Sequence, residues 1–476
     1  MLLFCFTITS TPAAWAGTVS TALYSGGPVT MFFGFLIVWV GSLAGAASLG
    51  ELCSMWPSAD GQISWTSHLA PKSCRRFARY YVAWLTCVAW IFMTSSAAFI
   101  CSVAIVGVTS FCNISYIPQA WHFVLLFWAV MLLAFCFNVG LFKLFGHLNS
   151  LNTTIAVLIT FVVVGVVLGM HNGEYNSAKF AFTNFVNGTG WENKSIVFIL
   201  GMVGASFSIL GYDSVTHMAE EIHEPEKNAP KAMVVSVLMS LPTGLLIILS
   251  VLFTVSDLES LSQQVFPFLG VLYDATGSTG GSVAILFFLS IFSAAAATIS
   301  MLATSGRVIW AFALEGGIPF SKWFSHISPR FGVPVRALAI SAVVQCLLVL
   351  IYLGNSALFN SIIQLAIALL NSSYAIPIAL MLFRGRPSGQ LKPGPFSLGP
   401  VLGPIANIVA LSYEIFISFF LFFPNVRPVT GSNMNYACAI VGVAHVLAGI
   451  YWFCGGKAKV ARHHEESTVS EEEKQG

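Results

Sequence analysis

The chain has 476 residues, of which 57% are hydrophobic and only 8% are charged, whereas charged residues make up about 25% of ordinary soluble domains. This composition excludes a soluble protein, and a formal net charge of +2 gives no reason to expect a nucleic-acid partner. The ten cysteines lie mostly in apolar segments and form no CxxC pair, so neither a metal site nor a disulfide framework is expected.

Apolar runs longer than about 18 residues recur along the chain, and each is long enough to form a membrane-spanning helix. We therefore predict an all-α polytopic membrane protein with about twelve transmembrane helices. The expected spans are residues 2–22, 29–55, 78–107, 120–140, 150–170, 195–218, 232–254, 282–304, 336–354, 358–383, 402–423 and 434–454.

Basic residues are distributed unevenly between the two sets of loops. An even number of spans places both termini on one side, and the loops of the other side hold only Lys179, Lys194 and Arg427 among the 21 Lys and Arg residues. Because positive charge gathers in cytosolic loops, we expect cytosolic termini. The plasma membrane is the first expectation for localisation and the vacuolar membrane the second.

Three glycosylation sequons support this orientation. Asn113-Ile-Ser, Asn187-Gly-Thr and Asn193-Lys-Ser all fall in loops predicted to face away from the cytosol, where N-glycosylation takes place. Asn113, Asn187 and Asn193 are therefore candidate glycosylation sites.

The two ends of the chain need separate consideration. The first seventeen residues have a short apolar core, but they lack the basic region of a signal peptide, so a genuine first span is favoured over a cleaved one. Residues 455–476 form a polar segment, which we predict to be a disordered cytosolic tail. The basic beginning of this tail could touch membrane lipid.

The sixth span is interrupted near its middle. Its apolar run breaks at Gly204 through Gly211 and ends in an acidic cluster that is followed by prolines. The first span is interrupted similarly at Thr7 through Pro12, since proline cannot donate a backbone hydrogen bond. Backbone groups freed within a membrane are tolerated only against protein or a polar cavity, so a span broken at this depth indicates a substrate site.

Three segments, which follow one another along the chain in the family's order, resemble the amino acid–polyamine–organocation permeases. The first runs from Gly50 to Pro71 and contains Met55-Trp56-Pro57-Ser58-Ala59-Asp60-Gly61-Gln62; the second is Gly211-Tyr212-Asp213 through Pro230; the third is Ala313 to Pro319 followed by Pro334-Val335-Arg336-Ala337. Short stretches such as Ser25-Gly26-Gly27-Pro28 look most like the fungal branch of GABA and choline permeases.

This resemblance implies two inverted repeats of five helices, in which the first helix of each repeat is broken, and two additional helices. The transport core would cover residues 1–385, with one repeat at about 1–170 and the other at about 195–385. Residues 386–454 would form the additional helices.

The resemblance also implies a substrate site at the two breaks. We expect Thr9, Ser10 and Thr11 to bind a carboxylate, and the carbonyls of Phe207, Ser208 and Ile209 to bind an ammonium group. The sequence departs from the family at the first break, where Thr-Ser-Thr-Pro replaces the usual Gly-x-Gly, and this leaves room for a cation without a carboxylate.

Aromatic residues offer an alternative way to bind such a cation. Trp90 lies in the third span, and Phe207 and Tyr212 flank the break in the sixth. Two or three rings of this kind can hold a quaternary ammonium group by cation–π attraction.

Acidic residues near the predicted cytosolic ends are candidates for gating or coupling. They are Glu51, Asp213, Glu220 and Glu221. Glu51 is expected to pair with Lys72 or Arg75. For Glu414 of the eleventh span and His445 of the twelfth, a mutual pair or a dimer contact is expected in preference to a role in transport chemistry.

The predicted function is a secondary active permease that moves a small nitrogenous solute, such as an amino acid or GABA, by alternating access. A choline or organocation permease and a transport-inactive nutrient sensor remain alternatives. No cofactor and no ATP-binding motif are indicated. The coupling ion is undetermined, with H⁺ favoured over Na⁺, and a monomer or weak homo-oligomer is expected. An enzyme is not indicated, because the sequence has neither an HExxH nor a GxSxG motif.

Overall fold

The computed structural model describes residues 2–171, 173–255, 257–354, 356–389, 391–431 and 433–456. These residues are helical throughout, apart from loops and a single isolated β-bridge between Ser25 and Asn187. Twelve helical segments among them are long and apolar enough to cross a membrane, which confirms the predicted all-α architecture and number of spans.

The first five spans occupy residues 2–169. They are built from α1 (Leu2–Thr9) and α2 (Thr11–Tyr24), α3 (Gly27–Val29), η1 (Thr30–Gly34) and α4 (Phe35–Met55), α6 (Arg75–Cys112), α7 (Ala120–Gly140), and η2 (Phe142–Leu144) with α8 (Phe145–Gly169).

The next five spans occupy residues 194–388. They are built from α10 (Lys194–Gly201), α11 (Val203–Ser208) and η3 (Tyr212–Glu221), α12 (Pro225–Thr254), α15 (Thr279–Leu286), η4 (Phe287–Phe292) and α16 (Ser293–Leu314), α18 (Val335–Leu348) and α19 (Ile351–Gly354), and α20 (Ser356–Leu380), η5 (Met381–Gly385) and η6 (Arg386–Ser388).

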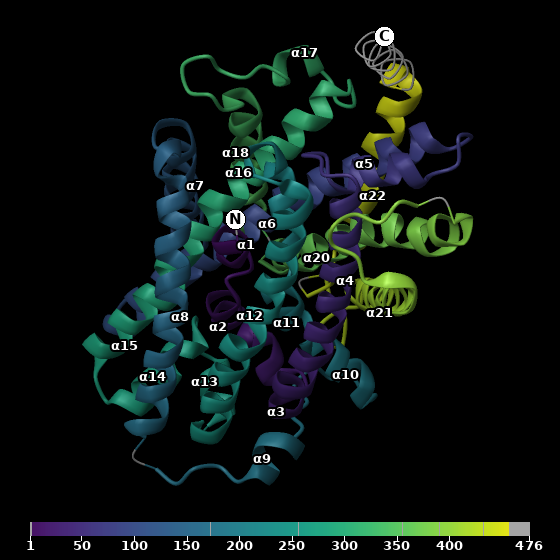
Figure 1. Cartoon of the computed structure of the whole chain (residues 1–476). Coiled ribbons are helices and arrows are strands. Elements are labelled where there is room, and N and C mark those ends of the chain that lie inside the picture. The colour runs from purple at the N-terminus through teal and green to yellow at the C-terminus, as the bar shows by residue number, and fades with distance from the viewer. Residues whose placement is uncertain are drawn as a thin grey trace.

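Two further spans follow, α21 (Gly399–Phe420) and α22 (Ala437–Tyr451) with η7 (Trp452–Gly456). Short helices lie in the loops at the two ends of the bundle (Figure 1): α5 (Gln62–Leu69) and α17 (Ser321–Phe324) at one end, and α9 (Ala178–Thr183), α13 (Leu258–Ser262) and α14 (Pro267–Thr276) at the other.

The first and sixth spans lie at the centre of the bundle. The two parts of the first span differ in their main contacts: α1 packs chiefly against α12, α8, α16 and η3, and α2 chiefly against α11, although α2 also touches α12. Around them, α4 packs against α12, and α6 packs against both α16 and α20. The eleventh span, α21, covers α4 and α20 from outside.

Candidate functional site

The first span changes direction at Ser10. α1 ends at Thr9, α2 begins at Thr11, and Ser10 between them has φ 37° and ψ 46°, in the left-handed region. Pro12 in the first turn of α2 lacks a backbone N–H, so the start of this helix is compatible with proline. Ser10 is buried, and its hydroxyl oxygen has no hydrogen-bond partner among the described residues.

The sixth span is interrupted between Ser208, where α11 ends, and Tyr212, where η3 begins. Gly211 has φ 89°, a conformation that a residue with a side chain rarely adopts. A Cβ atom at this position would lie 3.0 Å from Ile8 Cγ2 and 3.4 Å from Trp90 Cη2. The glycine therefore permits both the turn and the close approach of the first and third spans.

The two breaks are joined by a hydrogen bond. The Thr11 hydroxyl donates to the Ser208 carbonyl at 2.9 Å, and Thr11 Oγ1 lies 2.8 Å from the Ser240 hydroxyl of α12. The Ser208 hydroxyl donates to the Ala205 carbonyl and the Thr9 hydroxyl to the Phe6 carbonyl. These predicted site residues thus lie together, but in this conformation most of their polar groups bind to the protein itself.

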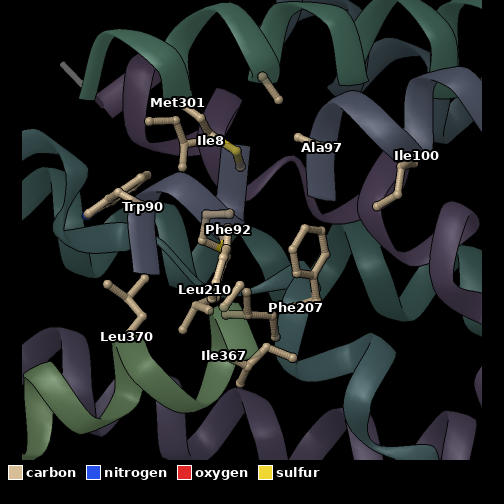
Figure 2. Close-up of a cluster of buried hydrophobic side chains, with 14 of the residues drawn as sticks. Ile8, Trp90, Phe92, Ala97, Ile100, Phe207, Leu210, Met301, Ile367 and Leu370 are labelled. Carbon is tan, nitrogen blue, oxygen red and sulfur yellow. The ribbon is translucent and has the colours of Figure 1, made fainter. Parts of the chain in front are cut away.

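Apolar side chains converge between the breaks (Figure 2). They come from α1, α6, α11, α16, α20 and the break itself, and include Ile8, Trp90, Phe92, Ala97, Ile100, Phe207, Leu210, Met301, Ile367 and Leu370. Ile209 and Tyr212, on either side of Leu210, are also buried.

Trp90 is the largest side chain in this cluster. It is 0% exposed, and its indole N–H has no hydrogen-bond partner in the described part of the chain. A buried indole usually finds such a partner. Its ring also lies edge-on to His217, with the centroids 6.1 Å apart. Trp90 therefore links the apolar cluster to the polar network that follows.

Asp213 is the centre of that network, and it is completely buried. Gln62 Nε2 of α5 donates to Asp213 Oδ2 at 2.6 Å, and the Tyr374 hydroxyl of α20 donates to Oδ1 at 2.5 Å. His217 Nε2 lies 3.3 Å from Oδ2. Two elements far apart in the sequence, α5 and α20, are therefore held to the first turn of η3 by one carboxylate.

His217 of η3 is also buried, with only 1% of its surface exposed. Its Nδ1 lies 2.9 Å from the Ala59 carbonyl, which can only accept, so Nδ1 carries a proton. His217 therefore links Asp213 to the loop that precedes α5.

Glu51 also departs from expectation. Its carboxylate binds the Arg386 guanidinium and accepts a 2.8 Å hydrogen bond from the Leu398 backbone N–H, instead of pairing with Lys72 or Arg75. The end of α4 faces the segment after the tenth span, where Arg386 is further held by a 2.7 Å bond to Asn407. Glu51 therefore joins the second, tenth and eleventh spans.

Two other ion pairs lie at the same end of the bundle. Glu221 pairs with Arg307 of α16, whereas Glu220 is exposed and lies outside the network around Asp213. Glu315 pairs with Arg79 of α6, and Asp60 lies 3.6 Å from the same guanidinium. Burial raises the pKa of Glu315 to about 7, even though Arg79 acts in the opposite direction.

The hydroxyl groups of the eighth span do not share a common centre. The Ser293 and Thr298 hydroxyls bind carbonyls of their own helix, and the Ser300 hydroxyl donates to Asn149 Oδ1 of α8 at 2.9 Å. The Asn149 carbonyl accepts a 3.2 Å bond from the Thr7 hydroxyl. Asn149 therefore ties the first, fifth and eighth spans, and no cluster of metal-ligating His, Cys, Asp or Glu residues occurs among the described positions.

The predicted pair in the last two spans is not formed. His445 Nε2 lies 2.8 Å from the Tyr81 hydroxyl, and neither carboxylate oxygen of Glu414 has a hydrogen-bond partner among the residues described. The two side chains face different neighbours, because α22 contacts α6 and α20 whereas α21 covers α4 and α20.

The three sequon asparagines are exposed. The side chain of Asn187 donates to the Trp191 carbonyl at 2.7 Å and accepts from the Thr189 hydroxyl. Asn193 accepts from the Ser195 backbone N–H at the start of α10, and Asn113 lies in the loop after α6.

Several residues of the site were not foreseen. Gln62, Tyr374, Ser240, Asn149 and Arg386 all form contacts that join different spans. In the sequence, each of these residues stands out only as a polar or charged side chain within or beside an apolar segment. That feature does not reveal which residue the side chain will contact.

The sequence comparisons agree with this architecture. The family model described as amino acid permease matches residues 2–444. A choline transporter of Saccharomyces cerevisiae is 33% identical over 93% of this chain and 79% of its own length. A putative amino acid/polyamine transporter of Macrophomina phaseolina is 32% identical over 92% of this chain and 97% of its own.

A more distant relative is the GABA-specific permease of Saccharomyces cerevisiae, which is 25% identical over 90% of this chain and 76% of its own length. The family match covers nearly the whole chain, including both breaks and the polar network around Asp213. The chain therefore belongs to the amino acid permease family, whose members are transporters and not enzymes.

Proposed function

We propose that this permease is a secondary active transporter whose substrate binds between the breaks at Ser10 and at Ile209–Gly211. The observation that carries this proposal is the position of the two breaks, which meet at the centre of the bundle through Thr11 and Ser208. Broken helices at this depth are the usual place for substrate in secondary transporters. Alternating access would move the halves of these spans relative to their neighbours.

The proposal includes a core of two inverted five-helix repeats, at about 1–170 and 195–385, with residues 386–454 outside it. The recurrence of span contacts supports this division. The third span packs on the fourth (α6 with α7), and the eighth packs on the ninth (α16 with α18). In the same way, the fourth span contacts the eighth (α7 with α16), and the ninth contacts the third (α18 with α6).

We propose a small organic cation of the choline class as the leading substrate. The cluster between the breaks is apolar and aromatic, and Trp90 can attract a quaternary ammonium group through its ring. A left-handed serine stands where related permeases have Gly-x-Gly, which disfavours a tight carboxylate site. A relative named as a choline transporter is 33% identical to this chain.

An amino acid such as GABA is the second candidate. Ser10 Oγ and Trp90 Nε1 are buried without partners in the described residues, and each can donate a hydrogen bond to a carboxylate. The beginning of α2 adds backbone N–H groups that the helix itself cannot satisfy. A relative named as a GABA-specific permease supports this candidate at 25% identity.

Proton coupling is proposed in preference to sodium coupling. A sodium site would draw on hydroxyls of the eighth span; those of Ser293, Thr298 and Ser300 donate to protein atoms, and Ser290 is buried without a partner among the described residues. The preference for protons therefore rests on the resemblance to fungal permeases. The plasma membrane, cytosolic termini and a monomeric or weakly associated protein complete the proposal.

The test is uptake of labelled choline and labelled GABA in cells that lack their own permeases, at two external pH values. Choline uptake that excess GABA does not block would support the cation site, and stimulation at the lower pH would support proton symport. GABA uptake that other amino acids block, and choline does not, would select the second candidate. Purified protein that binds these solutes but transports none of them in liposomes would indicate a sensor and contradict the proposal.

A further inference from the structure

Glu414 is an ionisable residue buried deep in the eleventh span. It lies fifteen residues beyond Gly399, the first residue of α21, which corresponds to about 22 Å along a helix. The side chain is 1% exposed, and neither of its carboxylate oxygens has a hydrogen-bond partner in the part of the chain that the structure describes.

The charged residues on the elements that pack against α21 do not neutralise Glu414. α4 carries Glu51, which pairs with Arg386. α10 carries Lys194 and η5 carries Arg384, both of which are exposed. The cysteine on α4, Cys53, is buried and carries no positive charge.

Two tyrosines complete this environment. Tyr374 of α20 donates its hydroxyl to Asp213. The neighbouring Tyr413 directs its hydroxyl to Ser206, 3.3 Å away. A carboxylate left without a cation or donors in such a setting is strongly disfavoured, because its desolvation is not compensated. In this conformation Glu414 is therefore an uncharged carboxylic acid.

Tyr212 connects Glu414 to the substrate site. A Cβ atom added at Gly45 would overlap the Tyr212 hydroxyl and lie 3.1 Å from Glu414 Oε1, so the two groups meet on the same side of α4. Tyr212 is the first residue of η3, directly after the break in the sixth span. Its ring is 5.2 Å from that of Tyr374.

We propose that Glu414 is the proton-binding group of the transport cycle. With the network around Asp213 intact, Glu414 is buried and holds its proton. When η3 moves and Tyr212 leaves α21, the carboxylic acid becomes hydrated and transfers its proton to water on the cytosolic side, leaving a carboxylate. The return to the opposite state takes a proton from water on the outer side. This inference rests on the proposed transport function.

The test separates exchange of substrate from its accumulation. The full chain is reconstituted into liposomes, and labelled choline or GABA is followed first in exchange against unlabelled solute, then under an imposed pH gradient. We expect Glu414→Gln to retain exchange within about twofold of the wild type but to lose at least about tenfold in pH-driven accumulation. The matched control is Glu192→Gln, which changes an exposed glutamate outside the site.

The proposal would be overturned if Glu414→Gln accumulated solute as well as the wild type does. It would also be overturned if the variant lost exchange and accumulation equally, because that result indicates a packing role. The same effect in the Glu192→Gln control would overturn it too. Failure of the wild type to exchange any solute would instead contradict the proposed transport function.

A measurement on the wild type applies even if the glutamine variant does not fold. Dicyclohexylcarbodiimide is an apolar reagent that modifies protonated carboxyl groups, and mass spectrometry identifies the modified residue. We expect modification of Glu414 at neutral pH and none of Glu192. A Glu414 that is unmodified at neutral pH but modified at a lower pH would show that it is reachable and not protonated at neutral pH, and would overturn the proposal.

Discussion

The Tyr374 hydroxyl donates a 2.5 Å hydrogen bond to Asp213 Oδ1, and so holds the tenth span against the sixth at the second residue of η3. Both side chains are completely buried. Since this contact joins two spans that are proposed to move relative to each other, it is the most direct place to test whether the network closes the cytosolic side.

Tyr374→Phe removes this donor and keeps the ring. Hydrogen bonds to charged groups contribute about 1.5–3 kcal/mol, so we expect a lower unfolding temperature in detergent and a higher accessibility of residues near the breaks to cytosolic thiol reagents. Tyr413→Phe is the matched control, because that hydroxyl makes a 3.3 Å contact with the Ser206 hydroxyl. Equal behaviour of the two variants would show that the network does not hold the closed state.

Trp90→Ala should weaken uptake of an organic cation. A desolvated cation–π contact is worth about 2 kcal/mol, which corresponds to a rise of about 30-fold in the KM for choline. Trp90→Phe should recover part of the loss, since it retains an aromatic face. Trp84→Phe, on the same helix but packed edge-on to Phe312, is the control. An unchanged KM in Trp90→Ala would remove this ring from the site.

Ser208→Trp should abolish uptake while the protein still reaches the cell surface. Ser208 is completely buried at the junction of the two breaks, so an indole there would occupy the space between them. Thr109→Trp places the same group at an exposed position near the end of α6 and should transport normally. Normal uptake by Ser208→Trp, measured against surface protein, would contradict the proposed location of the site.

Glu315 should make stability depend on pH. Because its pKa is raised from 4.5 to about 7 in the folded protein, the folded state binds more protons than the unfolded state between these values. The contribution of this group is therefore present at low pH and is lost as the pH rises through about 7.

The measurement is thermal unfolding in detergent from about pH 5 to about pH 8. The wild type should lose more stability over this range than Glu315→Gln, which cannot titrate. Arg79 and Asp60 face Glu315 and remain in both proteins. Parallel pH profiles of the two proteins would refute the role of Glu315.

Asn113 should carry a glycan. It is exposed in the loop after α6, whereas the side chain of Asn187 is engaged by Trp191 and Thr189. Asn113→Gln should therefore remove most of the gel-mobility shift caused by an N-glycosidase, and Asn187→Gln should remove less. A wild-type protein with no such shift would contradict either the glycosylation or the predicted orientation of this loop.

The positions of the spans and of the two breaks could be read from the sequence because their causes are local. Pro12 cannot continue the hydrogen bonding of the preceding turn, and Gly211 adopts a positive φ that other residues avoid. Hydrophobic run length likewise depends only on neighbouring residues.

The partners of the buried polar groups could not be predicted, because they depend on the packing of distant spans. Glu51 and Arg386 are 335 positions apart, and Asp213 and Tyr374 are 161 apart. Proximity in sequence suggested Lys72 or Arg75 for Glu51, but α4 ends against the segment that follows the tenth span. The direction in which a helix end faces is not encoded in its own residues.

The two breaks differ in one respect that has a consequence for energetics. Each places one residue in the left-handed region, but Gly211 adopts this conformation at little cost, whereas Ser10 has a Cβ atom and gives up about 1–2 kcal/mol. The break in the first span is therefore strained, whereas the break in the sixth span is not. Any rearrangement that returns Ser10 to a right-handed conformation recovers this energy. The strain thus favours conformational changes that straighten the first span, and it has no counterpart in the sixth.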